Sequence, residues 1–291
     1  MNAPATKLDP RRNVFREDLA AESLKDKVKA PRYAAGELRQ VVGAIAPVRI
    51  VPRFDAPLLT QALFGEMATV YDMQGGWAWV QLENDGYVGY MPADNLSVLI
   101  EEPTHWASAN GTFIYPTPDL KRPPITRLSF GSKLSVIGRE GRFAELSRGG
   151  FVFAGHLMPF EEKAKDFVAL AEALRGTPYL WGGRSSIGID CSALVQLGMQ
   201  AMGMSCPRDT DMQENEVGQK LPKNDVSQLK RGDLVFWRGH VGIAQSNKDL
   251  VHASGHQMEV ISEPVASAVE RIGATHGEVT SMRRIPNLKL G

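Results

Sequence analysis

The chain has 291 residues, enough for two or three domains, and 43% of them are hydrophobic, which is ordinary for a protein that folds around a core. Its 33 basic residues equal its 33 acidic residues, so the sequence lacks the positive charge typical of nucleic-acid binding, and we expect no nucleic-acid partner. No apolar run reaches the roughly 18 residues that a membrane-spanning helix needs, so we expect no membrane partner.

Residues 1–33 are predicted to form an N-terminal arm, in which Asp18 to Lys29 has the composition of a short helix. The arm carries charged side chains throughout and lacks the apolar core of a secretory signal. We therefore expect a cytoplasmic protein. If a signal has been trimmed from the natural start, the protein would instead be secreted.

Residues 34–100 and 101–159 are two β-rich segments that resemble each other. In each, a Phe-Gly pair is followed by valine five residues after the glycine, at Phe64-Gly65 and at Phe130-Gly131. Short alternating strands and glycine-rich turns recur at the same offsets. This internal repeat predicts two small β units, and their length and pattern resemble bacterial SH3-like barrels.

The composition changes after Pro159, and residues 160–291 are predicted to form an α+β domain. Apolar residues at helical spacing predict one helix within 160–175 and another over 193–204. Four buried strands are expected afterwards, at 234–237, 241–244, 250–253 and 258–261. Helices followed by a run of antiparallel strands are typical of this fold class.

Cys191 lies between a glycine-rich, strand-like segment and the second predicted helix, so its sulfur is expected at the start of that helix. Backbone N–H groups and the helix dipole there favour a thiolate. His240 and His252 follow in β-like stretches, which completes a set of nucleophile, base and orienting group. The other cysteine, Cys206, is expected to be structural, and without a CxxC pattern we predict no metal site and no cofactor.

Several ordered motifs of this domain resemble the NlpC/P60 cysteine peptidases over about residues 160–286. They are Pro178-Tyr179-Leu180-Trp181-Gly182-Gly183, Gly188-Ile189-Asp190-Cys191-Ser192, Arg231-Gly232-Asp233-Leu234-Val235-Phe236-Trp237, Gly239-His240-Val241-Gly242-Ile243 and Val251-His252-Ala253. With SH3-like units ahead of it, the chain is similar to γ-D-glutamyl-L-diamino acid endopeptidases, which act on peptidoglycan peptides. The resemblance implies a multi-domain fold, two small all-β SH3-like barrels followed by an α+β papain-like domain.

The residue types alone suggest a mechanism. Cys191 is expected to attack an amide carbonyl, His240 to move the thiol proton to the leaving amine, and His252 to orient the ring of His240. The backbone N–H of Cys191 is an expected oxyanion donor, and the hydroxyl of Tyr179 is expected to line that hole or the cleft.

The resemblance also implies substrate-binding residues. Asp190 and Ser192 would grip the polar end of a short muropeptide, and Thr210 would contact the D-Glu carboxylate. In the first barrel, Tyr87 would close the cleft and meet the free amine of L-Ala, with Glu66 as the opposing carboxylate. A cleft closed in this way admits only peptides with a free N-terminus, which favours an enzyme of murein peptide recycling that cuts the γ-D-Glu–diamino acid bond.

Other interpretations are open at this point. The same chemistry would serve a secreted hydrolase anchored to the wall by its barrels, and SH3-like modules also occur in binding proteins without catalysis. An amine could replace water as the acceptor of the acyl group. Tyr179 and Tyr87 could be core aromatics and Glu66 a solvated charge. Neither the diamino acid, diaminopimelate or lysine, nor the oligomeric state follows from the sequence.

Overall fold

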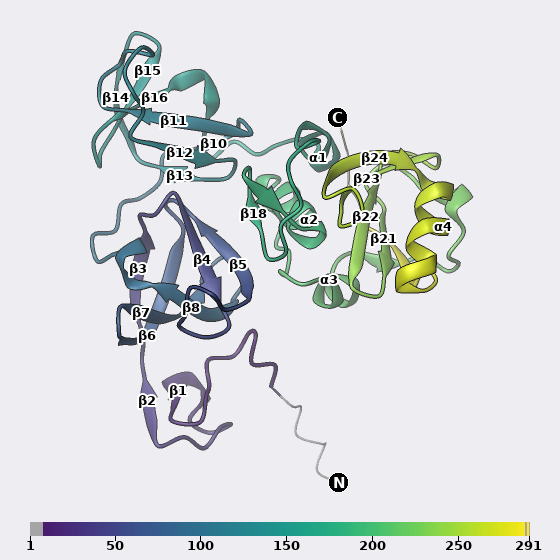
Figure 1. The fold of residues 1–291 in the computed structure, drawn as a ribbon, viewed down its shortest axis with the longest axis horizontal. Coiled ribbons are helices and arrows are strands. Elements are labelled where there is room, and N and C mark those ends of the chain that lie inside the picture. The colour runs from purple at the N-terminus through teal and green to yellow at the C-terminus, as the bar shows by residue number, and fades with distance from the viewer. Residues whose placement is uncertain (1–7, 289, 291) are drawn as a thin grey trace.

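The computed structural model describes residues 8–288 and 290, and in it two β bodies lie on one side of an α+β body (Figure 1). The first β body is one strongly curved sheet, with strand order β5-β4-β8-β7-β6-β3-β9. Alternate side chains such as Ala46, Val48 and Val80 are fully buried in its core. Its strands are β3 (Glu37–Val41), β4 (Ile45–Arg49), β5 (Leu58–Leu63), β6 (Met67–Gln74), β7 (Trp77–Leu82), β8 (Val88–Pro92) and β9 (Leu96–Ser97), with a 3₁₀ turn η2 (Ala93–Asn95).

The arm folds back on this first β body. Its strands β1 (Leu19–Ala21) and β2 (Arg32–Ala34) pair in parallel, and between them lies a 3₁₀ turn, η1 (Glu22–Leu24). The helix predicted over 18–29 is therefore wrong. Its apolar side chains, Leu19 and Leu24, instead join Trp79 and Val88 in a small buried cluster. Tertiary packing here overrides a weak local preference for helix.

The second β body has two sheets, ordered β12-β11-β16-β15-β14 and β13-β10-β17. Its core contains Ala107, Leu128 and Val152, all fully buried. The elements are β10 (His105–Ala107), β11 (Gly111–Tyr115), β12 (Thr126–Ser129), β13 (Lys133–Leu134), β14 (Val136–Glu140), β15 (Phe143–Leu146), β16 (Phe151–Phe153), η3 (Ala154–His156) and β17 (Leu157–Pro159).

The repeated Phe-Gly pair has a structural reason in the first β body. Gly65 adopts a positive φ, and a Cβ there would lie 2.1 Å from the backbone oxygen of Lys133. At the same place the N–H of Lys133 donates to the carbonyl of Phe64, at 2.8 Å. Glycine therefore allows the two β bodies to meet backbone to backbone.

The α+β body is built on a six-stranded sheet with strand order β20-β25-β21-β22-β23-β24. Helix α2 packs on β22 and β23, whereas α4 lies against the other face through Val265, Ala268 and Ile272 (Figure 1). The predicted helices and strands are all present. The elements are α1 (Phe167–Ala173), β18 (Arg184–Ser185), β19 (Gly188–Ile189), α2 (Cys191–Ala201), α3 (Thr210–Glu216), β20 (Gln219–Lys220), η4 (Val226–Gln228), β21 (Leu234–Trp237), β22 (His240–Ala244), β23 (Asp249–Ser254), β24 (Glu259–Pro264), α4 (Val265–His276) and β25 (Ser281–Arg284).

Candidate active site

Cys191 is the first residue of α2, and Asp190 is its N-cap. One carboxylate oxygen of Asp190 accepts the N–H of Ala193 at 2.8 Å, and the other accepts the N–H of Gly182 at 3.0 Å. The aspartate therefore fixes the helix start and the glycine-rich loop relative to each other. Because no preceding helical carbonyl can accept it, the N–H of Cys191 is available at the helix N-terminus.

The sulfur of Cys191 lies against the sheet and opens on a cleft. The backbone N–H of Val241, the residue after His240 at the start of β22, acts on the thiol and lowers its pKa, against the larger effect of burial. The hydroxyl of Thr210, the first residue of α3, lies 3.9 Å from the sulfur. Cys191 is 5% exposed and lines a cleft of about 340 Å³ together with Tyr179. The nucleophile is therefore shielded, but it faces the cleft and not only aliphatic packing.

A hydrogen-bonded relay runs from His240 away from the cleft. His240 Nε2 lies 2.7 Å from His252 Nδ1, and His252 Nε2 lies 2.7 Å from Glu263 Oε1. Arg271 on α4 pairs with the same carboxylate. Burial opposes ionisation of Glu263, but the hydrogen bond from His252 and the charge of Arg271 lower its pKa, so the carboxylate is charged.

The charge of Glu263 determines both ring tautomers. A carboxylate can only accept, so in a neutral His252 the Nε2 atom carries the proton and Nδ1 is an acceptor. His240 Nε2 must then donate to that nitrogen, which leaves His240 Nδ1 unprotonated. The relay therefore produces a free basic nitrogen on His240.

The expected resting thiolate is not what the structure favours. Burial, together with the charge of Asp190, raises the pKa of the Cys191 thiol to about 11. Burial also lowers the pKa of His240 well below its usual value, and the neighbouring His252, His276 and Arg271 act in the same direction. Desolvation outweighs the helix dipole, so the free site holds a neutral thiol and a neutral imidazole.

The loop before α3 supplies a buried cation that sequence reasoning missed. The guanidinium of Arg208 bonds both carboxylate oxygens of Asp190, at 2.9 and 2.6 Å, and the hydroxyl of Ser192 at 2.8 Å. Its Nε donates to Thr60 of β5, at 2.7 Å. Arg208 thus ties Asp190 and Ser192, both of which line the cleft, to the first β body.

One end of the cleft is formed by the first β body and the arm. The hydroxyl of Tyr87 donates to Asp209 Oδ2 at 2.9 Å. Arg11 of the arm donates to the same oxygen at 2.8 Å and to Asp211 at 2.8 and 3.0 Å. Tyr87, Arg11 and both aspartates line the cleft with Cys191. The structure therefore brings Tyr87 to the site, as the resemblance implied.

The loop before Cys191 also meets the first β body closely. Gly182 has a positive φ, and a Cβ there would lie 2.6 Å from the backbone oxygen of Leu58. Tyr179, on the same loop, lines the cleft, and burial raises the pKa of its hydroxyl. The hydroxyl of Tyr179 is therefore protonated at neutral pH and can donate a hydrogen bond.

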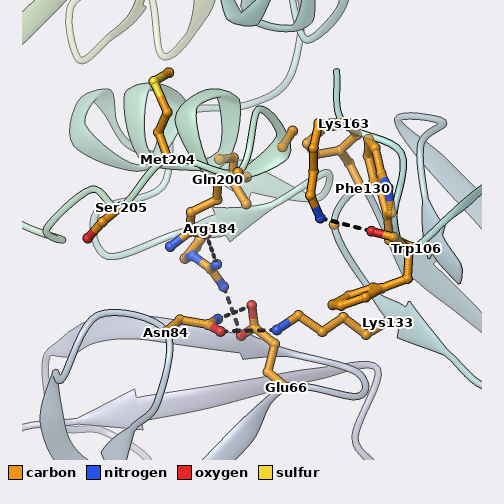
Figure 2. Close-up of a pocket in the computed structure, with 15 residues that line it drawn as sticks. Glu66, Asn84, Trp106, Phe130, Lys133, Lys163, Arg184, Gln200, Met204 and Ser205 are labelled. Atoms are coloured by element: carbon orange, nitrogen blue, oxygen red, sulfur yellow. Dashed lines mark hydrogen bonds and ion pairs between the residues drawn. The ribbon is translucent and has the colours of Figure 1, made fainter. Parts of the chain in front are cut away.

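Glu66 does not reach this cleft. Its side chain is buried and pairs with Arg184 at 2.9 Å, and it lines a different pocket between the three bodies (Figure 2). The expectation that Glu66 opposes Tyr87 at the substrate amine is therefore corrected. The carboxylate that Tyr87 meets is instead Asp209, which could not be predicted because its contacts with Tyr87 and Arg11 span 122 and 198 residues of sequence.

Two absences concern the described part of the chain. Among residues 8–288 and 290, no group of three or more His, Cys, Asp or Glu side chains is arranged so that it could coordinate a metal ion. Within the same residues, no helix combines the length and the apolar character needed to cross a bilayer.

Family models match two parts of the chain. Residues 176–272 match the NlpC/P60 family, and residues 48–96 match the bacterial dipeptidyl-peptidase SH3 domain. The first match covers the Cys191 helix, both histidines and Glu263. The second covers most of the first β body, including Tyr87.

Curated relatives extend over most of the chain. A gamma-D-glutamyl-L-lysine dipeptidyl-peptidase of Bacillus subtilis is 29% identical, over 72% of this chain and 77% of its own. A protein of the same name from Bacillus cereus is 27% identical, over 62% of this chain and 60% of its own. Dipeptidyl-peptidase 6 of Lysinibacillus sphaericus is 25% identical, over 76% of this chain and 90% of its own.

Solved structures share the fold. An NlpC/P60 family protein from Bacillus cereus superposes with a TM-score of 0.71 at 20% identity, over 87% of this chain and all of that one. An NlpC/P60 endopeptidase from Photobacterium damselae gives a TM-score of 0.60 at 16% identity, over 84% and 70%. The matched models show that the chain carries an NlpC/P60 domain, the domain of a family of cysteine peptidases, with a bacterial SH3 domain ahead of it.

Proposed function

We propose that the protein hydrolyses the amide between γ-D-Glu and the diamino acid in short peptidoglycan peptides that have a free N-terminus. The observation that carries this is the closed end of the cleft, where Tyr87 and Arg11 meet Asp209 beside Cys191. The names of the Bacillus relatives support γ-D-glutamyl specificity.

The closed end fits a small cation. Asp9, Asp209 and Asp211 surround Arg11, so three carboxylates face one guanidinium. This leaves negative charge for a second cation, such as the ammonium of an L-Ala residue, beside Asp209 and Tyr87. A longer or N-acylated peptide would meet the barrel and the arm. Thr210 and Ser192, which also line the cleft, are positioned to contact the glutamyl carboxylate.

The proposed mechanism uses the neutral pair described above. As the sulfur of Cys191 bonds to the amide carbon, its proton passes to His240 Nδ1, and the relay to Glu263 stabilises the new imidazolium. The oxyanion is stabilised by the N–H of Cys191 and the hydroxyl of Tyr179. The C–N bond then breaks, and the amine leaves with the proton from His240. Water, deprotonated by His240, cleaves the thioester and restores the thiol.

From the sequence repeat we infer that the second β body is a second SH3-like barrel. The proposed domain limits are 34–100 for the first barrel, 101–159 for the second and 160–291 for the peptidase domain. A role in murein peptide recycling and a cytoplasmic location are further proposals, and both rest on the proposed preference for a free amine. Strong sedimentation of the protein with intact sacculi would instead favour a secreted, wall-bound hydrolase.

The test compares matched peptides. L-Ala-γ-D-Glu-meso-diaminopimelate should be cleaved with release of the diamino acid, whereas its N-acetyl form should be cleaved far more slowly. Replacing diaminopimelate by lysine in this peptide tests which diamino acid the enzyme accepts on the leaving-group side of the cleaved amide. Cleavage of free and acetylated peptides at equal rates would overturn the proposed closed end.

A further inference from the structure

A second pocket lies where the two β bodies and the C-terminal half of α2 meet, and it shares no lining residue with the catalytic cleft. We call it the junction pocket. It encloses about 280 Å³, close to the lower limit of about 300 Å³ for small-molecule sites. Its lining includes Leu197. Figure 2 labels five more of its lining residues, Trp106, Phe130, Lys133, Lys163 and Gln200.

The apolar walls of the junction pocket are aromatic and rigid. Trp106 and Phe130 pack edge to face, with ring centroids 5.6 Å apart. The indole N–H of Trp106 is already used, because it donates to the carbonyl of Glu162 at 3.2 Å. These rings therefore offer flat hydrophobic surface to an occupant and no polar group.

The ion pair at the back of the junction pocket is internally satisfied. Arg184 donates to Glu66 at 2.9 Å, to Gln196 at 2.8 Å and to Gln200 Oε1 at 2.6 Å. Asn84 also donates to Glu66. The charges of Arg184 and Glu66 thus offset each other and leave the two lysines as the net charge of the pocket.

The unused hydrogen-bonding capacity consists of donors. Since Gln200 Oε1 faces Arg184, its Nε2 is turned elsewhere, and within the described residues this buried nitrogen has no partner. Among the residues that the structure describes, the ammonium group of Lys133 makes one hydrogen bond, to Asn84 at 3.2 Å. That of Lys163 also makes one, to the carbonyl of Phe160 at 2.8 Å. An ammonium group has three donors.

We propose that the junction pocket is a second ligand site, which binds a small carboxylate carried on a compact apolar or aromatic group. The carboxylate would accept from Lys133, Lys163 and Gln200 Nε2, and the apolar group would lie against Trp106 and Phe130. A cationic ligand would face two lysines, and a neutral apolar ligand would leave the donors unpaired.

The test uses 3-phenylpropionate as the probe and calorimetric titration of the full-length protein. The matched probe, 3-phenylpropan-1-ol, has the same apolar group without the charge. We expect the acid to bind at least tenfold more tightly than the alcohol, because only the acid forms charge-assisted hydrogen bonds with the two lysines. Equal affinity of the two probes, or no binding of the acid, would overturn the proposal.

Variants locate the site. Lys133→Met with Lys163→Met should weaken binding of the acid by about tenfold or more, whereas Lys121→Met with Lys223→Met, at exposed lysines elsewhere, should not change it. Lys163 is itself exposed, so Lys163→Met alone keeps the test valid if the double variant does not fold. Loss of acid binding in Cys191→Ala, with unchanged binding in the lysine variants, would place the probe in the catalytic cleft and contradict the inference.

Discussion

At the scale of single residues, the proposed catalysis uses a thiol and an imidazole that are both buried and both neutral. Sequence motifs were sufficient to propose Cys191, His240 and His252 as site residues, because each lies in a short local pattern. They could not show that desolvation outweighs the helix dipole, since burial is a property of the folded chain. Glu263 was missed for a similar reason, as nothing marks one glutamate of a strand as the partner of a histidine.

The pH dependence follows from the directions of the two pKa shifts. His240 must be neutral to accept the proton, and its pKa is lowered, so the acid limb of kcat/KM should lie below pH 6.5. The pKa of Cys191 is raised to about 11, so its alkylation by iodoacetamide should accelerate up to strongly alkaline pH. Rapid, pH-independent alkylation between about pH 4 and 8 would indicate an ion pair and contradict this account.

Glu263→Gln tests the relay. Without its negative charge, residue 263 no longer fixes the tautomers of His252 and His240 that leave His240 Nδ1 free to accept the thiol proton. It also stabilises the imidazolium less. We expect kcat to fall about tenfold to a hundredfold with little change in KM, equivalent to one charge-assisted hydrogen bond of about 1.5–3 kcal/mol. The control is Glu259→Gln, at an exposed glutamate of the same strand, β24. Equal losses in both variants would show that Glu263 acts only through stability.

At the scale of elements, the arm is part of the catalytic cleft. Its composition predicted a polar segment with a weak preference for helix. In the structure, however, Leu19 and Leu24 of the arm pack against β7 and β8. This packing places Arg11 beside Asp209, and the N–H of Val88 donates to the carbonyl of Arg11 at 2.8 Å. No local pattern could predict a contact between segments so far apart in sequence.

Arg11→Ala should reduce the preference for a free N-terminus. Without the guanidinium, the end of the cleft is wider and an N-acetyl group is tolerated, so the ratio of kcat/KM for free and acetylated peptides should fall by about tenfold, or ~1.4 kcal/mol. Arg12→Ala is the matched control, because Arg12 pairs with Glu216 outside the cleft. An unchanged ratio in Arg11→Ala would show that the barrel alone closes the cleft.

At the scale of the whole molecule, buried polar contacts hold the first β body against the peptidase domain. Gln61 accepts the N–H of Arg184 at 2.8 Å, and Gln196 donates to Asp85 at 2.9 Å. The sequence repeat predicted that β units precede the peptidase, and Tyr87 was placed at the cleft by resemblance. The contact between the first β body and the peptidase domain could not be predicted. The sequence does not distinguish a buried charged residue, such as Glu66, from one that is exposed to solvent.

Arg184→Met tests this docking. The change leaves Glu66 buried without its main counter-ion, so we expect the free energy of unfolding to fall by about 3–5 kcal/mol, followed as a lower urea midpoint. Arg184→Met combined with Glu66→Leu removes both charges and should recover much of the loss. A double variant as unstable as the single one would show that the pair does more than neutralise two charges.

The most direct test of the central claim is to trap the acyl-enzyme. The protein is mixed with L-Ala-γ-D-Glu-meso-diaminopimelate, quenched with acid within the first turnover and digested for mass spectrometry. We predict an L-Ala-γ-D-Glu acyl group on the peptide that contains Cys191, present in Cys206→Ala and absent in Cys191→Ala. Hydrolysis that continues in Cys191→Ala, or an acyl group found on Cys206, would contradict the account.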